Sequence, residues 1–257
     1  WSFNKSSSLN NLDANNSEIT FTPTSEYKTL TIKDNLTGSG TFNLNTNIAE
    51  NKSDKIVVQG TAEGNHKIGV TNQGANVANG KVTLVETNGG NAAFSLTNPN
   101  NRVDLGAYQY FLTKEGNNWV LAHSKNAVTS NAPALPSTPL LSSLANAQVS
   151  LRQAQLLVVE DDLSGIHQRL GEVKNGEKGN VWVRNVNSRQ KLAALSTGKS
   201  ETSGFKQNVH SLQVGADTAV TDNLRVGGFV GRSQANVDFN GHYGDGKVRS
   251  NSVGLYA

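Results

Sequence analysis

The residues best suited to chemistry are three consecutive acidic side chains in the middle of the chain, Glu160, Asp161 and Asp162. They are the one cluster of side chains with potential for catalysis. A second candidate is the Asn146-Ala147 bond, because an asparagine can cyclise onto its own carbonyl carbon and so break the chain. Any Asn-Ala pair shares that chemistry, and the carboxylates could equally face water and arginine side chains. A structural role therefore stays open for both.

Other motifs of enzymes and metal proteins are missing or incomplete. Cysteine is absent, which excludes thiolate zinc sites and cysteine nucleophiles, and the five histidines are dispersed without an i, i+4 pair. The run Gly198-Lys199-Ser200 resembles the end of a phosphate-binding loop, but Ala193 occupies the position of its first glycine. The net charge of +3 is weak and evenly spread. The sequence predicts no enzyme, no metal site, no cofactor and no nucleic-acid partner.

A helix is expected to carry the acidic run, because apolar residues recur at helical spacing between residues 140 and 174. Gly165 interrupts this pattern and should weaken or bend the helix. At ~1.5 Å per residue the helix would be about 50 Å long, which exceeds a bilayer, but its interior carboxylates exclude lipid contact. One interpretation is a coiled-coil or surface helix. The other is a plug inside a water-filled barrel.

Four long segments with alternating apolar residues follow the helix, at 180–192, 205–220, 223–236 and 247–257. Their length exceeds the ~5–6 residues usual in globular proteins and suits the ~9–11 residues that cross a membrane. Short and long connections alternate between them, as in outer-membrane barrels. No run of 18 apolar residues exists, so a membrane role must be through strands. A soluble antiparallel meander is the alternative.

The first 124 residues contain many short strands, which are separated by Asn- and Gly-rich turns. This composition favours a parallel β-helix, with a β-sandwich as the alternative. Residues 1–131 hold 23 of the 33 asparagines, and three of the five prolines lie within 133–139. This change in composition, together with the cluster of prolines, predicts an extended linker. The expected domains are the first at 1–124, a Pro-rich linker at 125–139, the helix at 140–175 and the strand-rich part at 176–257.

Several short motifs carry a family resemblance. In the second half they are Val181-Trp-Val-Arg184, Leu212-Gln-Val-Gly-Ala-Asp217, Val226-Gly-Gly-Phe-Val-Gly231 and Gly254-Leu-Tyr-Ala257, after a helix ending Gln168-Arg-Leu-Gly-Glu172. In the first half they are Leu36-Thr-Gly-Ser-Gly-Thr-Phe42, Asp54-Lys-Ile-Val-Val58, Asp104-Leu-Gly-Ala-Tyr108-Gln-Tyr110 and Asn118-Trp-Val-Leu121. In this order the motifs resemble the pertactin-like autotransporters of type V secretion.

The resemblance implies an all-β chain with one long helix. It consists of a right-handed parallel β-helix stem, a helical linker and the first four or so strands of a twelve-stranded outer-membrane β-barrel. In this family the helix threads the barrel, and the passenger emerges at the surface of a Gram-negative bacterium. The last passenger segment acts as an autochaperone for passenger folding. A solenoid can fold by propagation from an ordered end, which agrees with that role.

The resemblance also implies what the complete protein does. We expect an adhesin or surface-interaction protein, whose passenger contacts host surfaces or neighbouring cells and whose barrel contacts outer-membrane lipid. The alternative is an autotransporter whose missing N-terminal passenger carries a serine protease or another enzyme. A globular segment with a serine-protease motif upstream would favour the enzyme.

About four of twelve strands leave two open edges, at 181–187 and 248–257, and lipid offers these edges no hydrogen bonds. The chain is therefore expected to be a fragment, a truncated chain, or an assembly intermediate that pairs with another polypeptide. The family-implied partner for the last case is the barrel-assembly machinery.

Two groups of site residues complete the expectations. Some autotransporters cut their own passenger inside the pore, using an asparagine or acidic side chains, and this makes Asn146, Glu160, Asp161 and Asp162 candidates for self-cleavage. The densest aromatic cluster of the chain contains Tyr108, Tyr110, Phe111 and Trp119. We expect it to cap the open end of the β-helix within the autochaperone segment.

Overall fold

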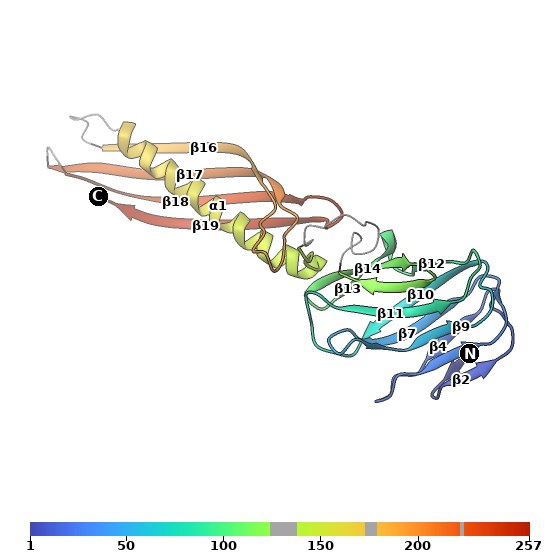
Figure 1. The fold of residues 1–257 in the computed structure, drawn as a ribbon. Coiled ribbons are helices and arrows are strands. Elements are labelled where there is room, and N and C mark those ends of the chain that lie inside the picture. The colour runs from blue at the N-terminus through green and yellow to red at the C-terminus, as the bar shows by residue number, and fades with distance from the viewer. Residues whose placement is uncertain (124–137, 173–178, 222–223) are drawn as a thin grey trace. The chain divides into compact units, whose positions relative to one another are not determined.

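The structure, a computed structural model, describes residues 1–123, 138–172, 179–221 and 224–257. These residues form two compact units, one of Trp1–Ser143 with Ser196–Glu201 and one of Leu144–Leu195 with Thr202–Ala257. Figure 1 shows stacked short strands in the first unit, and a long helix with four long strands in the second. The predicted linker at 125–139 lies almost entirely outside the described residues.

The first unit is a parallel β-solenoid, because equivalent strands of successive coils pair side by side. One sheet contains, in order, β1 (Ser2–Phe3), β4 (Glu18–Phe21), β7 (Thr41–Asn47), β10 (Asn65–Asn72) and β12 (Ala93–Leu96), with β8 (Lys52–Ser53) antiparallel to β7. A second contains β2 (Ser7–Leu9), β5 (Thr29–Ile32), β9 (Lys55–Val58) and β11 (Lys81–Thr87). The pair β3 (Leu12–Asp13) and β6 (Leu36–Thr37) forms a third sheet. The β-helix interpretation is confirmed over the sandwich.

The coils of the solenoid differ in length. Ser7 pairs with Leu30, Leu30 with Ile56 and Ile56 with Val85, so successive coils advance by 23, 26 and 29 residues. Leu30, Ile56 and Val85 are fully buried in one continuous apolar core. Removal of this apolar column from water is the main stabilising contribution of the stack. To continue this core, each coil must place apolar residues at the same inward positions. The corners between the strands do not have to match, so they can differ in length.

The last strands of the first unit run antiparallel and cover the end of the second sheet. After the short 3-10 helix η1 (Pro99–Asn101), β13 (Arg102–Leu105) pairs with β14 (Tyr108–Glu115), and β14 pairs with β15 (Asn118–Ala122). β15 in turn pairs antiparallel with β11, at the edge that a further coil would use. The reversal leaves no trace in the apolar alternation, and the sequence pattern did not predict it.

The second unit consists of one helix on a four-stranded antiparallel sheet. α1 (Ser143–Glu172) lies along one face of β16 (Gly179–Leu192), β17 (Phe205–Thr221), β18 (Leu224–Phe239) and β19 (Asp245–Tyr256), which pair in sequence order (Figure 1). The structure thus contains the expected long helix and the expected long strands. Among the described residues, no helix is long and apolar enough to cross a membrane.

An apolar cluster holds the first half of α1 on the sheet. Ala154 and Val158 of the helix pack with Phe205, Val209 and Val237 of β17 and β18.

Gly165 has a different role from the one expected. The helix continues through it, and an ideal Cβ at this position would lie 2.9 Å from Gln213 Oε1. The glycine therefore permits a close approach of α1 to β17.

Candidate functional site

The acidic run of α1 is divided between solvent and the sheet. Glu160 is exposed, whereas Asp161 accepts hydrogen bonds from Ser188 Oγ at 2.6 Å and Gln190 Nε2 at 2.9 Å, both on β16. Successive helical residues are rotated by about 100°, so only part of a consecutive run can face one surface.

Asp162 is the most buried member of the run, with 6% of its surface exposed. Its Oδ1 accepts from Ser211 Oγ at 2.9 Å and from Ser233 Oγ at 2.8 Å. These serines are direct cross-strand partners on β17 and β18, and Gln213 Nε2 donates to the Asp162 backbone oxygen at 3.1 Å. The partners are hydroxyl and amide groups, not the arginine side chains that the sequence suggested. Asp161 and Asp162 together tie one turn of the helix to three strands.

Asn146 lies in the first turns of α1 and is fully buried. Its Nδ2 donates to Ser203 Oγ at 3.0 Å, and its Oδ1 accepts from the Ser203 backbone N–H at 2.8 Å. Both ends of the amide are thus engaged. At ~1.5 Å per residue, Asn146 is more than about 20 Å along the helix from Asp161. The structure does not bring the four self-cleavage candidates together into one site.

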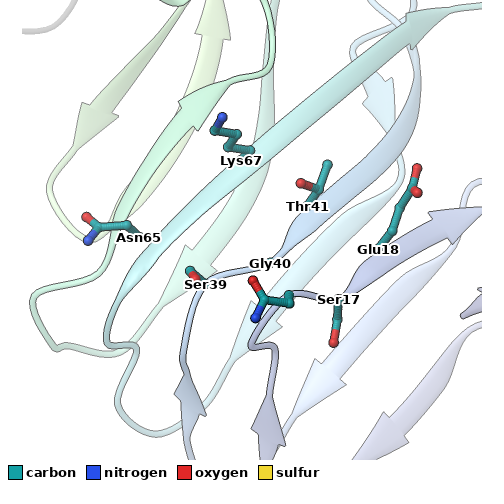
Figure 2. Close-up of a pocket in the computed structure, with 8 residues that line it drawn as sticks. Ser17, Glu18, Ser39, Gly40, Thr41, Asn65 and Lys67 are labelled. Carbon is teal, nitrogen blue, oxygen red and sulfur yellow. The ribbon is translucent and has the colours of Figure 1, made fainter.

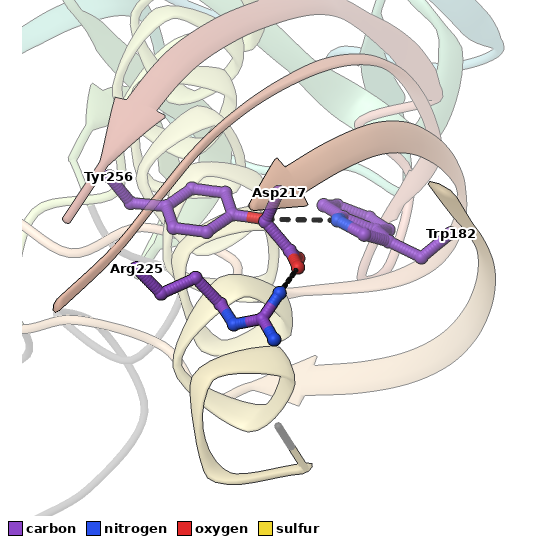
Figure 3. A network of polar contacts seen from close by, with 4 residues as sticks. All are labelled: Trp182, Asp217, Arg225 and Tyr256. Carbon is purple, nitrogen blue, oxygen red and sulfur yellow. Dashed lines mark hydrogen bonds and ion pairs between the residues drawn. The ribbon is translucent and has the colours of Figure 1, made fainter. Parts of the chain in front are cut away.

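A polar network that sequence reasoning missed lies on the helix-facing side of the sheet (Figure 3). Arg225 Nη1 and Asp217 Oδ1 form an ion pair at 2.5 Å, and Tyr256 donates to Asp217 Oδ2 at 2.9 Å. Trp182 Nε1 donates to the Tyr256 hydroxyl at 3.0 Å. The network therefore links all four strands. The sequence contained one signal for this network. Asp217 and Arg225 have opposite charges and lie on the polar faces of consecutive strands, and their cross-strand partners, Gly227 and Ala219, are small.

Three aromatic rings of the sheet pack against glycines of the neighbouring strand. An ideal Cβ on Gly215 would meet Trp182, one on Gly227 would lie 2.5 Å from Tyr256 Cζ, and one on Gly254 would meet Phe229. The rings of Trp182 and Tyr256 can take part in the network only because these glycines leave room for them.

The outer face of the sheet, away from α1, contains two aliphatic rows. Cross-strand pairing aligns Val183, Val214, Val230 and Val253 in one row, and Val181, Ala216, Gly228 and Leu255 in the next. Val253 and Leu255 are 81% and 91% exposed. On β17 the outward residues from Leu212 to Val220 are apolar apart from Thr218, and they span about 26 Å at ~3.3 Å per residue, comparable with the ~25 Å apolar band of outer-membrane barrels. This face has the chemistry of a lipid contact.

The four aromatic residues predicted to cap the solenoid lie on β14 and β15. Tyr110 is fully buried and donates to the backbone oxygen of Val77, and Phe111 is 5% exposed. Tyr108 and Trp119 are half-buried against the solenoid core. The Trp119 ring lies 5.6 Å from that of Phe94 in β12. The cluster thus joins the antiparallel end of the unit to the last coil.

Trp119→Ala should loosen this end of the solenoid. Loss of a fully buried tryptophan costs ~3–5 kcal/mol, and because Trp119 is half-buried we expect about 2 kcal/mol. Hydrogen exchange of the β14 and β15 amides in the full chain is the measurement. Exchange should become about thirtyfold faster, and protection as high as that of the wild type would refute the capping role.

His66 is buried in the solenoid between the rings of Phe42 and Phe94. The Gly40 N–H donates to its Nδ1 at 3.3 Å, and its Nε2 lies 2.9 Å from the Glu63 backbone oxygen. A neutral ring with the proton on Nε2 satisfies both contacts. Burial lowers the pKa of His66, because the charged ring would lose its hydration.

The stability of the solenoid should therefore depend on pH. The unfolded histidine binds a proton near pH ~6.5. The folded one, with its lowered pKa, binds a proton only at lower pH, so the free energy of unfolding falls as pH drops below ~6.5. Burial lowers the pKa of His123 too, which acts in the same direction. Thermal unfolding between pH 7.5 and 5 tests this. His66→Phe should weaken the dependence, and an unchanged slope would contradict the assignment.

A polar hollow of about 500 Å³ lies on the solenoid surface, at one corner of three successive coils (Figure 2). It is lined by Asn16, Ser17, Glu18, Ser39, Gly40, Thr41, Asn65 and Lys67. Glu18, Thr41 and Lys67 form one cross-strand row within it. Hydroxyl, amide and charged groups of this kind suit a polar ligand. Within the part of the chain that the structure describes, no three His, Cys, Asp or Glu side chains group to hold a metal ion.

Comparison with known proteins agrees with this geometry. The family model described as Pertactin matches residues 9–123, and that of the Autotransporter beta-domain matches residues 181–257. The BrkA autotransporter of Bordetella pertussis is 31% identical over 100% of this chain and 25% of its own length. The pertactin autotransporter of Bordetella bronchiseptica is 31% identical over 90% of this chain and 28% of its own. The autotransporter adhesin/invasin TibA of Escherichia coli is 34% identical over 47% and 13%.

A β-solenoid, followed by a helix on a sheet with an aliphatic outer face, is the arrangement expected of an autotransporter. With both family models matched in order, the chain belongs to the pertactin-like autotransporters of type V secretion. The sheet is accordingly an outer-membrane element, and the solenoid lies at the surface of a Gram-negative cell. The chain spans about a quarter of the length of BrkA and pertactin.

Proposed function

We propose that the complete protein is a self-secreting, non-enzymatic surface protein of the adhesin type, whose barrel and helix deliver a β-helical passenger to the cell surface. The observation that carries this proposal is the order of the elements: a pertactin-type solenoid, then α1, then strands with an aliphatic outer face. A relative named an adhesin/invasin supports adhesion as the passenger's role. The contacts proposed for the passenger are host surfaces or neighbouring cells.

The unpaired edges of the sheet support a further part of the proposal. Within the described strands, β16 and β19 are the edges of the sheet. Lipid offers no hydrogen bonds, so an unpaired backbone N–H or C=O group in the membrane costs several kcal/mol. Each edge strand must therefore pair with another strand. We propose that these partners are the remaining strands of a twelve-stranded barrel in the finished protein, and a strand of the barrel-assembly machinery during biogenesis.

Expression of the complete reading frame in a Gram-negative host tests the proposal. Protease added to intact cells should digest the solenoid, and cells that display it should adhere to host cells more than cells with an empty vector. A variant lacking residues 143–172 should keep the passenger from the surface. A solenoid protected from external protease would overturn surface delivery, and hydrolytic activity of the passenger without adhesion would favour the enzyme alternative.

For the acidic run we propose anchoring of the helix in place of self-cleavage. The support is that Asp161 and Asp162 are both engaged with strand side chains, far from Asn146. Asp162→Ala removes the acceptor that Ser211 and Ser233 share, although these two hydroxyls can still bond each other across 2.7 Å. We expect helix docking to lose about 2 kcal/mol.

Limited proteolysis of the assembled membrane protein measures this effect. Cleavage within residues 147–172 should become about thirtyfold faster in Asp162→Ala. Glu160→Ala is the matched control, because Glu160 is an acidic residue of the same run, two positions before Asp162, but is exposed. Equal cleavage rates in the two variants would contradict anchoring. If the passenger is released from the wild type and from Glu160→Ala but not from Asp162→Ala, the self-cleavage hypothesis would be restored.

A further inference from the structure

Directly beyond the aliphatic rows, the outer face of the sheet becomes cationic. Arg232 is the next outward residue after Val230 and pairs across the strands with Leu212 and Asn251. In the following row Arg249 pairs with Gln234. In the third row Asn208 and Asn236 pair with each other, and they are flanked by Arg189 on β16 and Lys247 on β19. We call Arg189, Arg232, Lys247 and Arg249 the cationic belt.

The charges of the belt are exposed, and among the residues that the structure describes they have no acidic partner. All four side chains are exposed, and Arg189 donates a hydrogen bond from Nε to Asn208 Oδ1 at 2.9 Å. Within the described ranges, none of the four forms a salt bridge. The nearest acidic residues on this face, Asp238 and Asp245, lie one row further out.

That outermost row balances its own charge. It contains Lys191 and Lys206 together with Asp238 and Asp245. The two acidic residues therefore compensate two lysines of their own row, and the positive charge of the belt remains uncompensated.

The belt also lies at a defined depth. At ~3.3 Å per residue, Arg232 is about 7 Å beyond Val230 along β18, and Lys247 is about 20 Å before Val253 along β19. The aliphatic rows occupy the hydrocarbon layer, so the belt begins at its edge, where the headgroups of lipids lie. It is on the side of the connection between β16 and β17, where Ser203 contacts the beginning of α1. In a surface-delivering autotransporter this side faces the cell exterior.

We propose that the cationic belt binds the phosphate groups of an anionic lipid in the outer leaflet, and so fixes the depth and tilt of the barrel in the membrane. This rests on the proposed function, because it requires the sheet to be embedded with the α1 N-terminus outward. Arginine presents a planar fork of donors that matches phosphate oxygens, and lysine adds a point charge. Cations next to a membrane surface strengthen binding to anionic lipids, each by several-fold. The spacing over three rows suits a headgroup layer, which is thicker than one row.

The test uses the complete folded protein in detergent, titrated with bisphosphorylated lipid A and followed by native mass spectrometry. The variant R232Q/K247Q/R249Q removes three charges of the belt. The control K5Q/K33Q/K52Q removes three exposed lysines of the solenoid. We expect the apparent dissociation constant to rise at least about tenfold in the belt variant and to change less than about twofold in the control. Should the triple variant not fold, as judged by heat-dependent gel mobility, the single variants R249Q and K247Q give the same comparison.

Two further arms separate the possible sources of phosphate. Dephosphorylated lipid A should bind weakly to the wild type, and inorganic phosphate at equal concentration should not displace bisphosphorylated lipid A. Equal binding of dephosphorylated lipid A, or of lipid A by the belt variant and the wild type, would overturn the proposal. Full displacement by inorganic phosphate would assign the belt to free phosphate and overturn the lipid. If surface protease digests the solenoid but the belt variant binds normally, the inference alone fails and the proposed function stands.

Discussion

Replacement of Asp54 with alanine is expected to unfold the middle coils of the solenoid. The Asp54 side chain is fully buried between β8 and β9. It accepts from the Lys28 backbone N–H at 2.8 Å, the Asn45 backbone N–H at 2.8 Å and Asn45 Nδ2 at 2.7 Å. Alanine leaves these buried donors without their acceptor, and each such donor costs ~1–3 kcal/mol. Asn45 Nδ2 keeps its second bond, to the Phe21 backbone oxygen, so we expect a loss on the order of 4 kcal/mol.

Hydrogen exchange in the full chain measures the effect strand by strand. Amides of β5, β7 and β9 should exchange up to about a thousandfold faster in Asp54→Ala, whereas the four strands of the second unit should be unaffected. Asp34→Ala is the matched control, because Asp34 is an exposed aspartate of the same solenoid, and its loss should cost less than about 0.5 kcal/mol. If the two variants protect β7 equally, the buried carboxylate does not hold these coils together.

The strands of the second unit were predictable because each meets two different environments. Leu212, Val214 and Ala216 face outward, while the residues between them face α1, which gives the period of two that the sequence shows. The register between strands had no such signal. It depends on cross-strand contacts such as the hydrogen bond between Ser211 and Ser233, which are 22 residues apart. The acidic run shows the same limit, since nothing local distinguishes exposed Glu160 from buried Asp162.

The solenoid was predictable as a class but not in its details. The coils of 23, 26 and 29 residues have the same inward apolar positions but corners of different length. The sequence therefore shows the short strands, but it has no fixed repeat length. The antiparallel turn at β13–β15 keeps the same alternation as the parallel coils, and only the pairing partner changes. Asp54 begins one of the family motifs, but the sequence did not indicate its buried bonding role, because its donors at Lys28 and Asn45 are brought to it by the winding of the chain.

Gly215→Ala is expected to prevent most of the barrel sheet from assembling. A Cβ at this position would lie 2.5 Å from Trp182 Cε2 and 2.7 Å from the backbone oxygen of Gly228. The indole is rigid and the oxygen belongs to the neighbouring strand, so neither can move away without cost. Displacement of the ring would also break the hydrogen bond from Trp182 to Tyr256, and with it the connection of β16 to the Asp217 network. Overpacking of this kind costs ~1–3 kcal/mol, before the network is counted.

The yield of folded protein in the outer membrane, read from heat-dependent gel mobility, should fall about tenfold or more in Gly215→Ala. Gly228→Ala is the matched control on the next strand, because its Cβ would lie 3.1 Å from the end of the flexible Leu255 side chain and 3.4 Å from the nearest backbone oxygen. It should assemble nearly as well as the wild type.

A double variant separates steric conflict from loss of the glycine itself. In Trp182→Ala the ring is gone, so adding Gly215→Ala should cost much less than it does alone, and the two effects should be non-additive. Additive effects would mean that Gly215 is needed for its backbone freedom and not for the space it leaves to the indole. In that case the packing of Trp182 on Gly215 would be a consequence of strand pairing. Non-additive effects would instead show that this packing helps the strands to pair.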